Sequence, residues 1–519
     1  MRSRTRREFF TDVGTGMVVA SVGAALATDL GFSPAFAADG PETLNFGRLE
    51  PLVCLLQETP ANRLLPELTR RLQGGTEVRE LVSAAALANA RTFGGEDYVG
   101  FHTMMALSPA YHMANELPQA RRALPVFKVL YRNTTRIQER GGRKNEVLRP
   151  VQPAMLPEGR VGGEVVRDAA RARDMDAAER AFAAIARNGA DDAFNHVLYA
   201  VEDATEVHRT VLPYRAWDLV GLVGREQAHT LLRQSVRYCV RNESPRYVES
   251  LGAVRTLLPR LLDQHKLIGR RLGTRTADDR WVRDMSQTLF RSTAAQAAEA
   301  VAAALAEGMP PDAIGEAVSL AANQLVLRDE GRPPNQSAPN RPPGSVHGDG
   351  IGVHASDSAN AWRNMARVAN ERNRIVCLIL AGYQVAQDRA ARGGDFLKWE
   401  PYPREEARNR VEARDQAGLL REAEDAIRNS DQPRACAAIH WYGAQGHAHR
   451  PVFDLLLRYA CSEDGALHAE KYYRTVAENF AASRAAFRWQ YVVALARVTT
   501  SAYGQPAPGY AEACKLLQV

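Results

Sequence analysis

Four histidines of this chain stand in a shared sequence context that places an imidazole at the start of a helix. Three of them follow an aspartate by five residues. Ahead of His468, Asp464 stands four residues away and Glu463 takes the fifth place. An apolar residue precedes every one of the four, and each opens a segment of helical composition. The four histidines are His102, His208, His354 and His468.

If these histidines converge, they form a chemical site. Imidazole is a common ligand for zinc, copper and iron, so the four side chains are candidate metal ligands as well as candidate catalytic residues. Iron or copper would suit oxygen chemistry, and zinc would suit hydrolysis. Without a metal ion, the same rings could act as general acids and bases on a phenolic or carbonyl substrate. His196 and His440, which lie near the motifs, are additional candidate ligands. A purely structural interpretation stays open, in which each histidine donates to a carbonyl inside the core.

The aspartates of the motifs have a simpler expected role. Aspartate is a favoured helix N-cap because its side chain accepts hydrogen bonds from the free amides of the first turn. We therefore predict that the four motif aspartates cap the helices that carry the histidines. They are Asp97, Asp203, Asp349 and Asp464.

The spacing of the histidines predicts an internal repeat. They are 106, 146 and 114 residues apart, and an insertion into a unit of roughly 110 residues would explain the long middle interval. Residues 80–86 also resemble 316–322, and residues 125–133 resemble 232–239. Units of this kind stack helices on one another. We expect a four-fold repeat, either an α-solenoid or a closed α/α ring, with units near 38–160, 161–275, 276–395 and 396–519.

Periodicity predicts an all-α fold. Apolar residues recur at helical spacing in many segments, whereas alternating runs with hairpin turns are nearly absent. Helices are expected within residues 62–72, 77–90, 167–187, 286–307, 408–429 and 472–500. Two breaks rich in glycine and proline, 141–163 and 329–352, cannot be helical. The second break leads directly into the motif of His354, so it is either a candidate rim of the site or a plain surface excursion.

The first residues predict export. A twin-arginine pair at Arg6 and Arg7 precedes two phenylalanines, an apolar stretch over 13–26 and a small-x-small pattern at 35–37. We interpret residues 1–37 as a twin-arginine signal peptide and residues 38–519 as one exported helical domain in the periplasm or outside the cell. An uncleaved anchor is the alternative, although its apolar core is short for a membrane-spanning helix. No later stretch is apolar enough to span a membrane, so no stable insertion is expected after cleavage.

Composition narrows the class of partner. The formal net charge is +6 over 519 residues, and acidic residues are mixed with basic ones almost throughout, which argues against nucleic-acid binding. The six cysteines are scattered without a Cys-x-x-Cys motif, which excludes cysteine-rich zinc sites and covalent haem. Most are expected to be buried, and Cys436 and Cys461 are the nearest pair for one disulfide.

Two segments resemble the questin oxidase-like family, namely residues 353–361 around His354 and residues 463–472 around His468. The segment of His102 is a looser match. The resemblance implies an all-helical fold with recurring His-led helices and an oxygen insertion of the Baeyer–Villiger type on a polycyclic aromatic substrate. It also implies consumption of a reduced nicotinamide, NADPH, although no nucleotide-binding glycine loop is visible in the sequence.

Three functions remain open on the sequence. The first is an exported oxidoreductase that binds a small aromatic molecule in a His-lined interior cavity, with or without a metal ion. The second is a helical-repeat binding or scaffold protein without catalysis, which predicts four histidines separated in space. The third is a helical-toroid polysaccharide hydrolase or lyase, in which Trp281, Trp399 and Trp441 stack on sugars. The sequence shows no carboxylate pair that would serve the third function.

Overall fold

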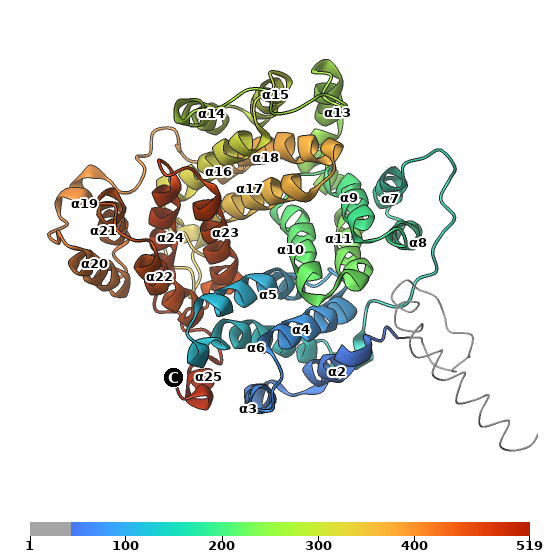
Figure 1. The fold of residues 1–519 in the computed structure, drawn as a ribbon, viewed down its shortest axis with the longest axis horizontal. Helices are drawn as coiled ribbons and strands as arrows, with labels where there is room; N and C mark the ends of the chain where they lie inside the picture. The colour runs from blue at the N-terminus through green and yellow to red at the C-terminus, as the bar shows by residue number, and fades with distance from the viewer. Residues whose placement is uncertain (1–42) are drawn as a thin grey trace, which may run out of the picture.

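The computed structural model describes residues 43–519, and this part of the chain is all-α. It contains 24 α-helices and no β-strand, as the periodicity predicts. Figure 1 shows the helices arranged around the middle of the molecule, with α5, α10, α17 and α23 innermost. The predicted signal peptide, residues 1–37, lies outside the described residues.

Four successive groups of five helices make up most of the molecule. Group 1 contains α2(Glu50–Glu58), α3(Ala61–Gln73), α4(Val78–Phe93), α5(Tyr98–Glu116) and α6(Leu124–Glu139). Group 2 contains α7(Gly162–Arg171), α8(Met175–Ala186), α9(Ala190–Val201), α10(Val207–Val223) and α11(Ala228–Asn242). Group 3 contains α14(Asp279–Arg291), α15(Ala294–Ala306), α16(Pro311–Arg328), α17(Ile351–Val368) and α18(Glu371–Arg392). Group 4 contains α20(Gln416–Arg428), α21(Gln432–Ala444), α22(Arg450–Ser462), α23(Ala469–Ala482) and α24(Arg488–Ala502).

The same helix contacts recur inside every group. The first helix packs on the third, the second packs on the fifth, and the fourth lies against both the third and the fifth. Four helices stand outside this scheme, namely α12(Pro245–Leu251), α13(Val254–Gln264), α19(Glu405–Asn409) and α25(Tyr510–Leu517). The fourth helix of each group is the innermost one, and one of the motif histidines lies in its first two turns or directly before it.

The groups close on one another. The inner helices touch in the cyclic order α5, α10, α17, α23 and back to α5, while α25 returns to pack on α3 and α6. A buried lysine seals the junction between the last group and the first. The Lys128 ammonium donates to the carbonyl oxygens of Ala460 at 2.8 Å and Glu463 at 2.5 Å, and it lies 2.6 Å from the Glu470 carboxylate. The chain therefore forms a ring of helices and not an open row.

Several predicted helices are two helices in the structure. The segment 167–187 is divided between α7 and α8, where Arg173 has a φ of 59° and Asp174 caps α8 by accepting from the Ala177 amide. The segment 286–307 is divided between α14 and α15 at Thr293, which caps α15. The segments 408–429 and 472–500 are likewise interrupted, and in each case a polar cap or a short turn ends a continuous apolar pattern.

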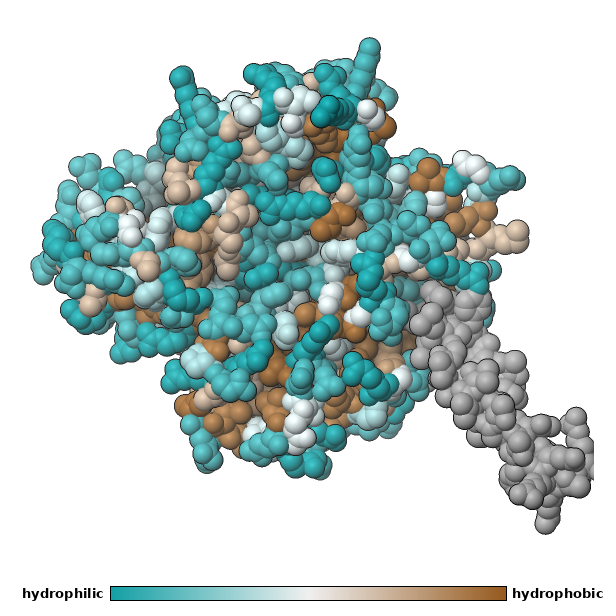
Figure 2. Space-filling view, viewed as in Figure 1, coloured by the Kyte–Doolittle hydropathy of each residue, from teal (hydrophilic) through white to brown (hydrophobic). Residues whose placement is uncertain are grey.

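The surface of the described chain is predominantly hydrophilic in the face that Figure 2 shows. Among residues 43–519 no helix has the length and apolar character needed to cross a membrane. All six cysteines are free, so Cys436 and Cys461 are buried thiols and do not form the disulfide considered from the sequence.

Candidate active site

The four motif histidines meet at the centre of the helical ring. The Nε2 atoms of His102 and His208 are 3.2 Å apart, and those of His354 and His468 are 2.9 Å apart. The ring centres follow one another at 4.7, 5.8, 5.0 and 5.2 Å around the cycle His102, His208, His354, His468. We call these four residues the histidine tetrad. The separated histidines that a scaffold protein predicts are not what the structure contains.

Each ring comes from the beginning of an inner helix. His102 lies in the second turn of α5, His208 is the second residue of α10, His354 is the fourth of α17, and His468 immediately precedes α23. Contacts between the inner helices continue beyond the tetrad, as in the hydrogen bond from Thr475, seven residues after His468, to Asp357, three residues after His354. Because each inner helix begins at the tetrad, all four run away from it toward their C-terminal ends.

Three of the four rings are held through Nδ1, which leaves Nε2 for the centre. The Nδ1–H of His102 donates to the Tyr98 carbonyl at 2.7 Å, and that of His468 donates to the Ala466 carbonyl at 2.6 Å. The Nδ1 atom of His208 lies 2.6 Å from the Glu206 carboxylate. Because these oxygens accept the Nδ1 proton, the neutral rings present an unprotonated Nε2. This is also the arrangement in which histidines bind metal ions in proteins.

Glu206 is ionised where it anchors His208. Burial favours its neutral form, but the adjacent His208, together with the amides of His208 and Arg209, outweighs this effect and lowers its pKa to about 2. The Tyr238 hydroxyl donates a further hydrogen bond to Glu206 at 2.8 Å. The carboxylate thus supplies one negative charge beside His208.

Burial keeps the other rings of the tetrad neutral. Desolvation, reinforced by the nearby Lys471 ammonium and by neighbouring rings, lowers the pKa of His102, His354 and His468, in the case of His354 to about 3. His102 is 1 % exposed and His468 3 %, whereas His208 and His354 are partly exposed. Solvent therefore reaches the tetrad on the side of His208 and His354.

Aromatic side chains and the 329–352 segment surround that side. The Tyr98 ring packs on His102 at 4.3 Å, and Phe101 packs on both His102 and His208 at 5.0 Å. Arg341 of the segment pairs with Asp349 at 2.5 Å, and both charges act on the Tyr98 hydroxyl. The segment thus lies at the edge of the tetrad, where the sequence suggests a rim.

A buried polar row continues from the tetrad along the inner helices. Lys471 and Asp357 each lie three residues after a tetrad histidine, and both are at most 3 % exposed. Asp357 accepts from the Thr475 hydroxyl at 2.8 Å, while its second oxygen has no hydrogen-bond partner among the described residues. Burial raises the pKa of Asp357 and lowers that of Lys471 to about 8. A cation and a carboxylate thus lie in the core directly beyond the histidines.

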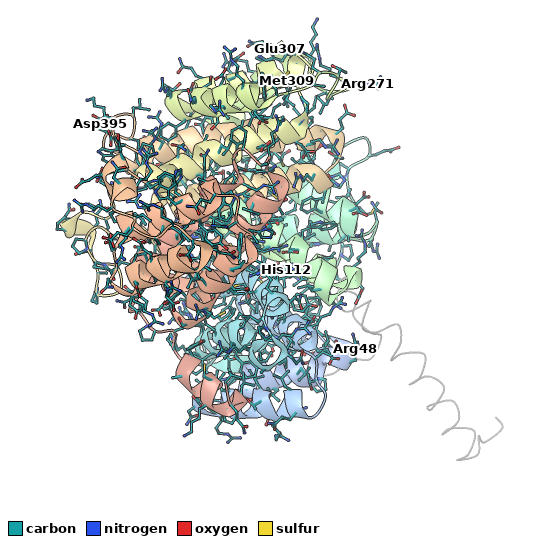
Figure 3. The ribbon with its side chains drawn as sticks, turned by 60° about the vertical axis from the view of Figure 1, so that its left-hand side comes forward. Arg48, His112, Arg271, Glu307, Met309 and Asp395 are labelled. Carbon is teal, nitrogen blue, oxygen red and sulfur yellow. The ribbon has the colours of Figure 1, made fainter. Side chains whose placement is uncertain are left out.

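The row ends at a second cluster of charged groups. Glu478 accepts from the Asn360 amide at 2.5 Å and from the Tyr214 hydroxyl at 3.0 Å. Asp218 lies 3.5 Å from Arg215 and 3.6 Å from His112. His112, labelled near the middle of Figure 3, belongs to α5 and lies three helical turns from His102. Polar groups therefore extend through the inner helices from the tetrad to their far ends.

The predicted aspartate caps are correct at only one position. Asp97 caps α5 by accepting from the Gly100 amide at 2.9 Å. Glu206 caps α10, Gly350 precedes α17, and the side chain of Asp464 accepts no capping hydrogen bond. All four aspartates, Asp97 included, pair with arginine, because a guanidinium can bind a carboxylate through two parallel hydrogen bonds. The pairs are Asp97 with Arg136 and Arg140, Asp203 with Arg171, Asp349 with Arg332 and Arg341, and Asp464 with Arg132.

The two additional candidate ligands lie outside the tetrad. His196 accepts a hydrogen bond at Nδ1 from the Gly163 amide, 2.9 Å away, and stacks on Tyr199. His440 contacts Trp441 and lines an apolar pocket beside Trp489. Of the tryptophans considered for sugar binding, Trp399 packs on Phe396 and the Trp441 indole donates to the Arg408 carbonyl.

The sequence did not indicate the supporting residues Glu206, Lys471 and Asp357. Lys471 and Asp357 carried a usable signal, since a residue three places after a histidine lies on the same helix face. No sequence pattern indicated Glu206, because its contact with the His208 ring depends on how the chain turns just before α10. Among residues 43–519, no three His, Cys, Asp or Glu side chains have ligand atoms already in place for a metal ion, because the tetrad meets as two pairs.

No family model, curated protein or solved structure matches the chain.

Proposed function

We propose that the protein is an oxidoreductase whose reacting centre is the histidine tetrad, and that the tetrad binds one first-row transition-metal ion. The observation that carries the proposal is the anchoring of three rings through Nδ1. It directs unprotonated Nε2 atoms at one another. Two such nitrogens 3.2 Å apart, on His102 and His208, repel unless a proton or a metal ion lies between them.

The dimensions of the tetrad suit a metal ion. Metal–nitrogen distances near 2.0–2.1 Å place neighbouring nitrogens of a tetrahedral site roughly 3.3 Å apart and their ring centres roughly 5 Å apart. The nitrogen distances within the two pairs are 3.2 and 2.9 Å, and the ring centres are separated by 4.7 to 5.8 Å. Four neutral imidazoles suit copper, iron or zinc.

The surroundings favour an aromatic substrate. The partly exposed side of the tetrad carries Tyr98, which is 57 % exposed and whose ring could pack on a flat molecule, while the buried Phe101 packs on Tyr98 and His208. A bound redox metal would supply electron transfer to or from such a substrate or oxygen. The protein would orient the substrate on the aromatic rings, limit access of water on the buried side of His102 and His468, and hold a carboxylate at Glu206. Oxidation of a small aromatic molecule is also what the resemblance to the questin oxidase-like family implies.

The charges beyond the tetrad fit a role in proton supply. Lys471 has a pKa of about 8, so it can release and regain a proton near neutral pH. Asp357, with its raised pKa and one oxygen without a partner among the described residues, is the nearest acidic group of the row. Export by the twin-arginine route is part of the proposal, since a chain that travels folded can acquire its metal before leaving the cytoplasm.

The decisive experiment is metal analysis of the purified chain after folding with iron(II), copper(II) or zinc(II). We expect about one ion per chain, and its loss in His102→Ala, His208→Ala, His354→Ala and His468→Ala. His447→Ala is the matched control, since His447 lies outside the tetrad, where it hydrogen-bonds the Gln445 side chain and packs on Tyr442. Folded protein that binds none of the three metals would refute the metal centre.

The reaction is tested separately by oxygen uptake with a panel of polycyclic phenols, with and without NADPH. We expect uptake with the iron or copper form and none with the zinc form or the His208→Ala variant. A tetrad that holds only zinc, or that binds copper or iron without substrate-dependent uptake, would contradict an oxidoreductase while leaving the metal site intact.

A further inference from the structure

A second cavity, of about 230 Å³, lies between α14, α16 and the beginning of α24. Its lining shares no residue with the tetrad or its anchors. The floor is apolar, with Phe290 5 % exposed and Phe487 2 % exposed. Three arginines surround this floor, namely Arg283, Arg291 and Arg328. We call this space the arginine cavity.

Helical spacing brings these groups to one place. On α14, Phe290 and Arg291 follow Arg283 by seven and eight residues, which is two helical turns, so the three side chains lie on one face. On α16, Gln324 and Arg328 are one turn apart. Two helices thus contribute cations from opposite sides, and the phenylalanines lie between them.

The arginine cavity has no negative charge to balance its cations. Its lining contains no aspartate or glutamate. Among residues 43–519, none of its three arginines forms an ion pair, whereas most arginines near the tetrad do. The Arg328 guanidinium donates to the Gln324 side chain at 3.0 Å and to the Trp399 carbonyl at 2.6 Å, both uncharged acceptors. Burial and the nearby Arg291 both lower its pKa. Such a set of cations is most stable when an anion joins it.

Aromatic rings stand next to the cations. The Arg328 guanidinium lies 5.5 Å from the centre of the Phe290 ring, and that of Arg283 lies 5.7 Å from the Phe487 ring. A guanidinium binds a carboxylate or a phosphate through two parallel hydrogen bonds. The phenylalanine faces offer packing for a flat ring attached to that anion.

We propose that the arginine cavity binds a small organic anion, a molecule of one or two aromatic rings that carries a carboxylate or a phosphate. Its volume lies below the 300–1,000 Å³ typical of drug-sized ligand pockets, which limits the ligand to this size. This site is independent of the proposed reaction at the tetrad.

Isothermal titration of the full chain with three naphthalene probes tests the proposal. 2-Naphthoate, 2-naphthyl phosphate and the neutral 2-naphthamide share the ring and differ in the headgroup. We expect at least one of the anions to bind about tenfold or more tightly than the amide. The tighter of the two anions identifies the headgroup.

Two variants locate the binding. Arg283→Ala and Arg291→Ala remove exposed side chains, so both should fold, and each should weaken the anion by about tenfold. Arg280→Ala on the same helix is the matched control, because Arg280 is 86 % exposed, pairs with Asp284 and lies outside the lining. Equal affinity for the neutral amide, an unchanged affinity in the Arg283→Ala/Arg291→Ala double variant, or no binding of either anion would overturn the proposal.

Discussion

At the scale of single residues, the histidines of the tetrad could be predicted from the sequence, whereas the groups that hold their rings in place could not. The histidines were visible because four copies of a similar context repeat along the chain. Their anchors were not visible, since the carbonyls of Tyr98 and Ala466 are backbone atoms that any residue would provide. The cap prediction was wrong for the other three aspartates for a related reason. The arginine partners of Asp203 and Asp464 lie 32 and 332 residues away along the chain, so no local spacing indicates these pairs.

Asp97 is the aspartate whose contribution to stability can be isolated. Burial alone would raise its pKa, but hydrogen bonds from Arg136, the Gly100 amide and Arg140 lower it to about 2. Because the pKa in the unfolded chain is near 3.8, this contribution is complete above about pH 4 and is lost as the pH falls toward 2. Asp97→Asn keeps a capping side chain and removes only the charge.

We expect Asp97→Asn to lower the free energy of unfolding by roughly 2 kcal/mol at pH 7. The difference from the parent chain should shrink below pH 4 in urea titrations. Asp176→Asn, which alters an exposed first-turn carboxylate, should have little effect at any pH. A pH-independent effect of Asp97→Asn would show that its charge is not responsible.

At the scale of helices, the fold class could be predicted and the number of helices could not. The spacing of apolar residues indicates which face of a helix is buried. The same spacing continues across a break between two helices when the second helix also buries an apolar face. The breaks at Arg173 and Thr293 depend on one residue of positive φ and one capping box, which are weak local signals inside apolar surroundings. The prediction that the histidines lie near helix starts did not depend on these breaks, because each histidine requires only that its own helix begins nearby.

Close packing of α17 on α16 fixes the position of His354. A Cβ atom at Gly352 would lie 2.6 Å from the Val326 backbone nitrogen and 2.8 Å from its Cα, and backbone atoms cannot move aside as a flexible side chain can. We expect Gly352→Ala to destabilise the protein by about 1–3 kcal/mol and to displace the start of α17. Thermal unfolding measures the first effect, and metal stoichiometry at the tetrad measures the second.

Gly221 in α10 supplies the control for this substitution. No atom lies within 4 Å of a Cβ built there, and the residue is helical. Gly221→Ala should therefore stabilise the chain by up to about 1 kcal/mol, because alanine has the higher helix propensity. Equal effects of the two substitutions would show that the contact with Val326 is unimportant.

At the scale of the whole molecule, closure of the ring depends on a buried ion pair. Lys128 on α6 and Glu470 on α23 are 2.6 Å apart, with side chains 3 % and 1 % exposed. Removing one partner leaves the other charge buried without compensation, which costs about 3–5 kcal/mol. We therefore expect Lys128→Met to lower stability by this amount in urea unfolding.

Two comparisons make the closure prediction specific. Lys398→Met removes a lysine that is 82 % exposed and pairs within its own turn, so stability should change by less than about 1 kcal/mol. Combining Lys128→Met with Glu470→Leu removes both charges and should recover much of the loss. A double variant no more stable than Lys128→Met would assign the effect to lost packing.

The Lys128–Glu470 ion pair also determines when the four tetrad histidines can come together during synthesis. Three tetrad histidines are present once residue 354 has been made, yet the fourth belongs to the helix that this ion pair fastens, more than 300 residues after Lys128. During synthesis, group 1 cannot pack on group 4 until group 4 has been made. Contacts between residues so far apart in the sequence form late. The order of translation thus sets an order of assembly, in which a chain that stops before group 4 holds only three of the four tetrad histidines. Under the proposed function, such a chain would be distinguishable from finished protein because it would not bind the metal ion.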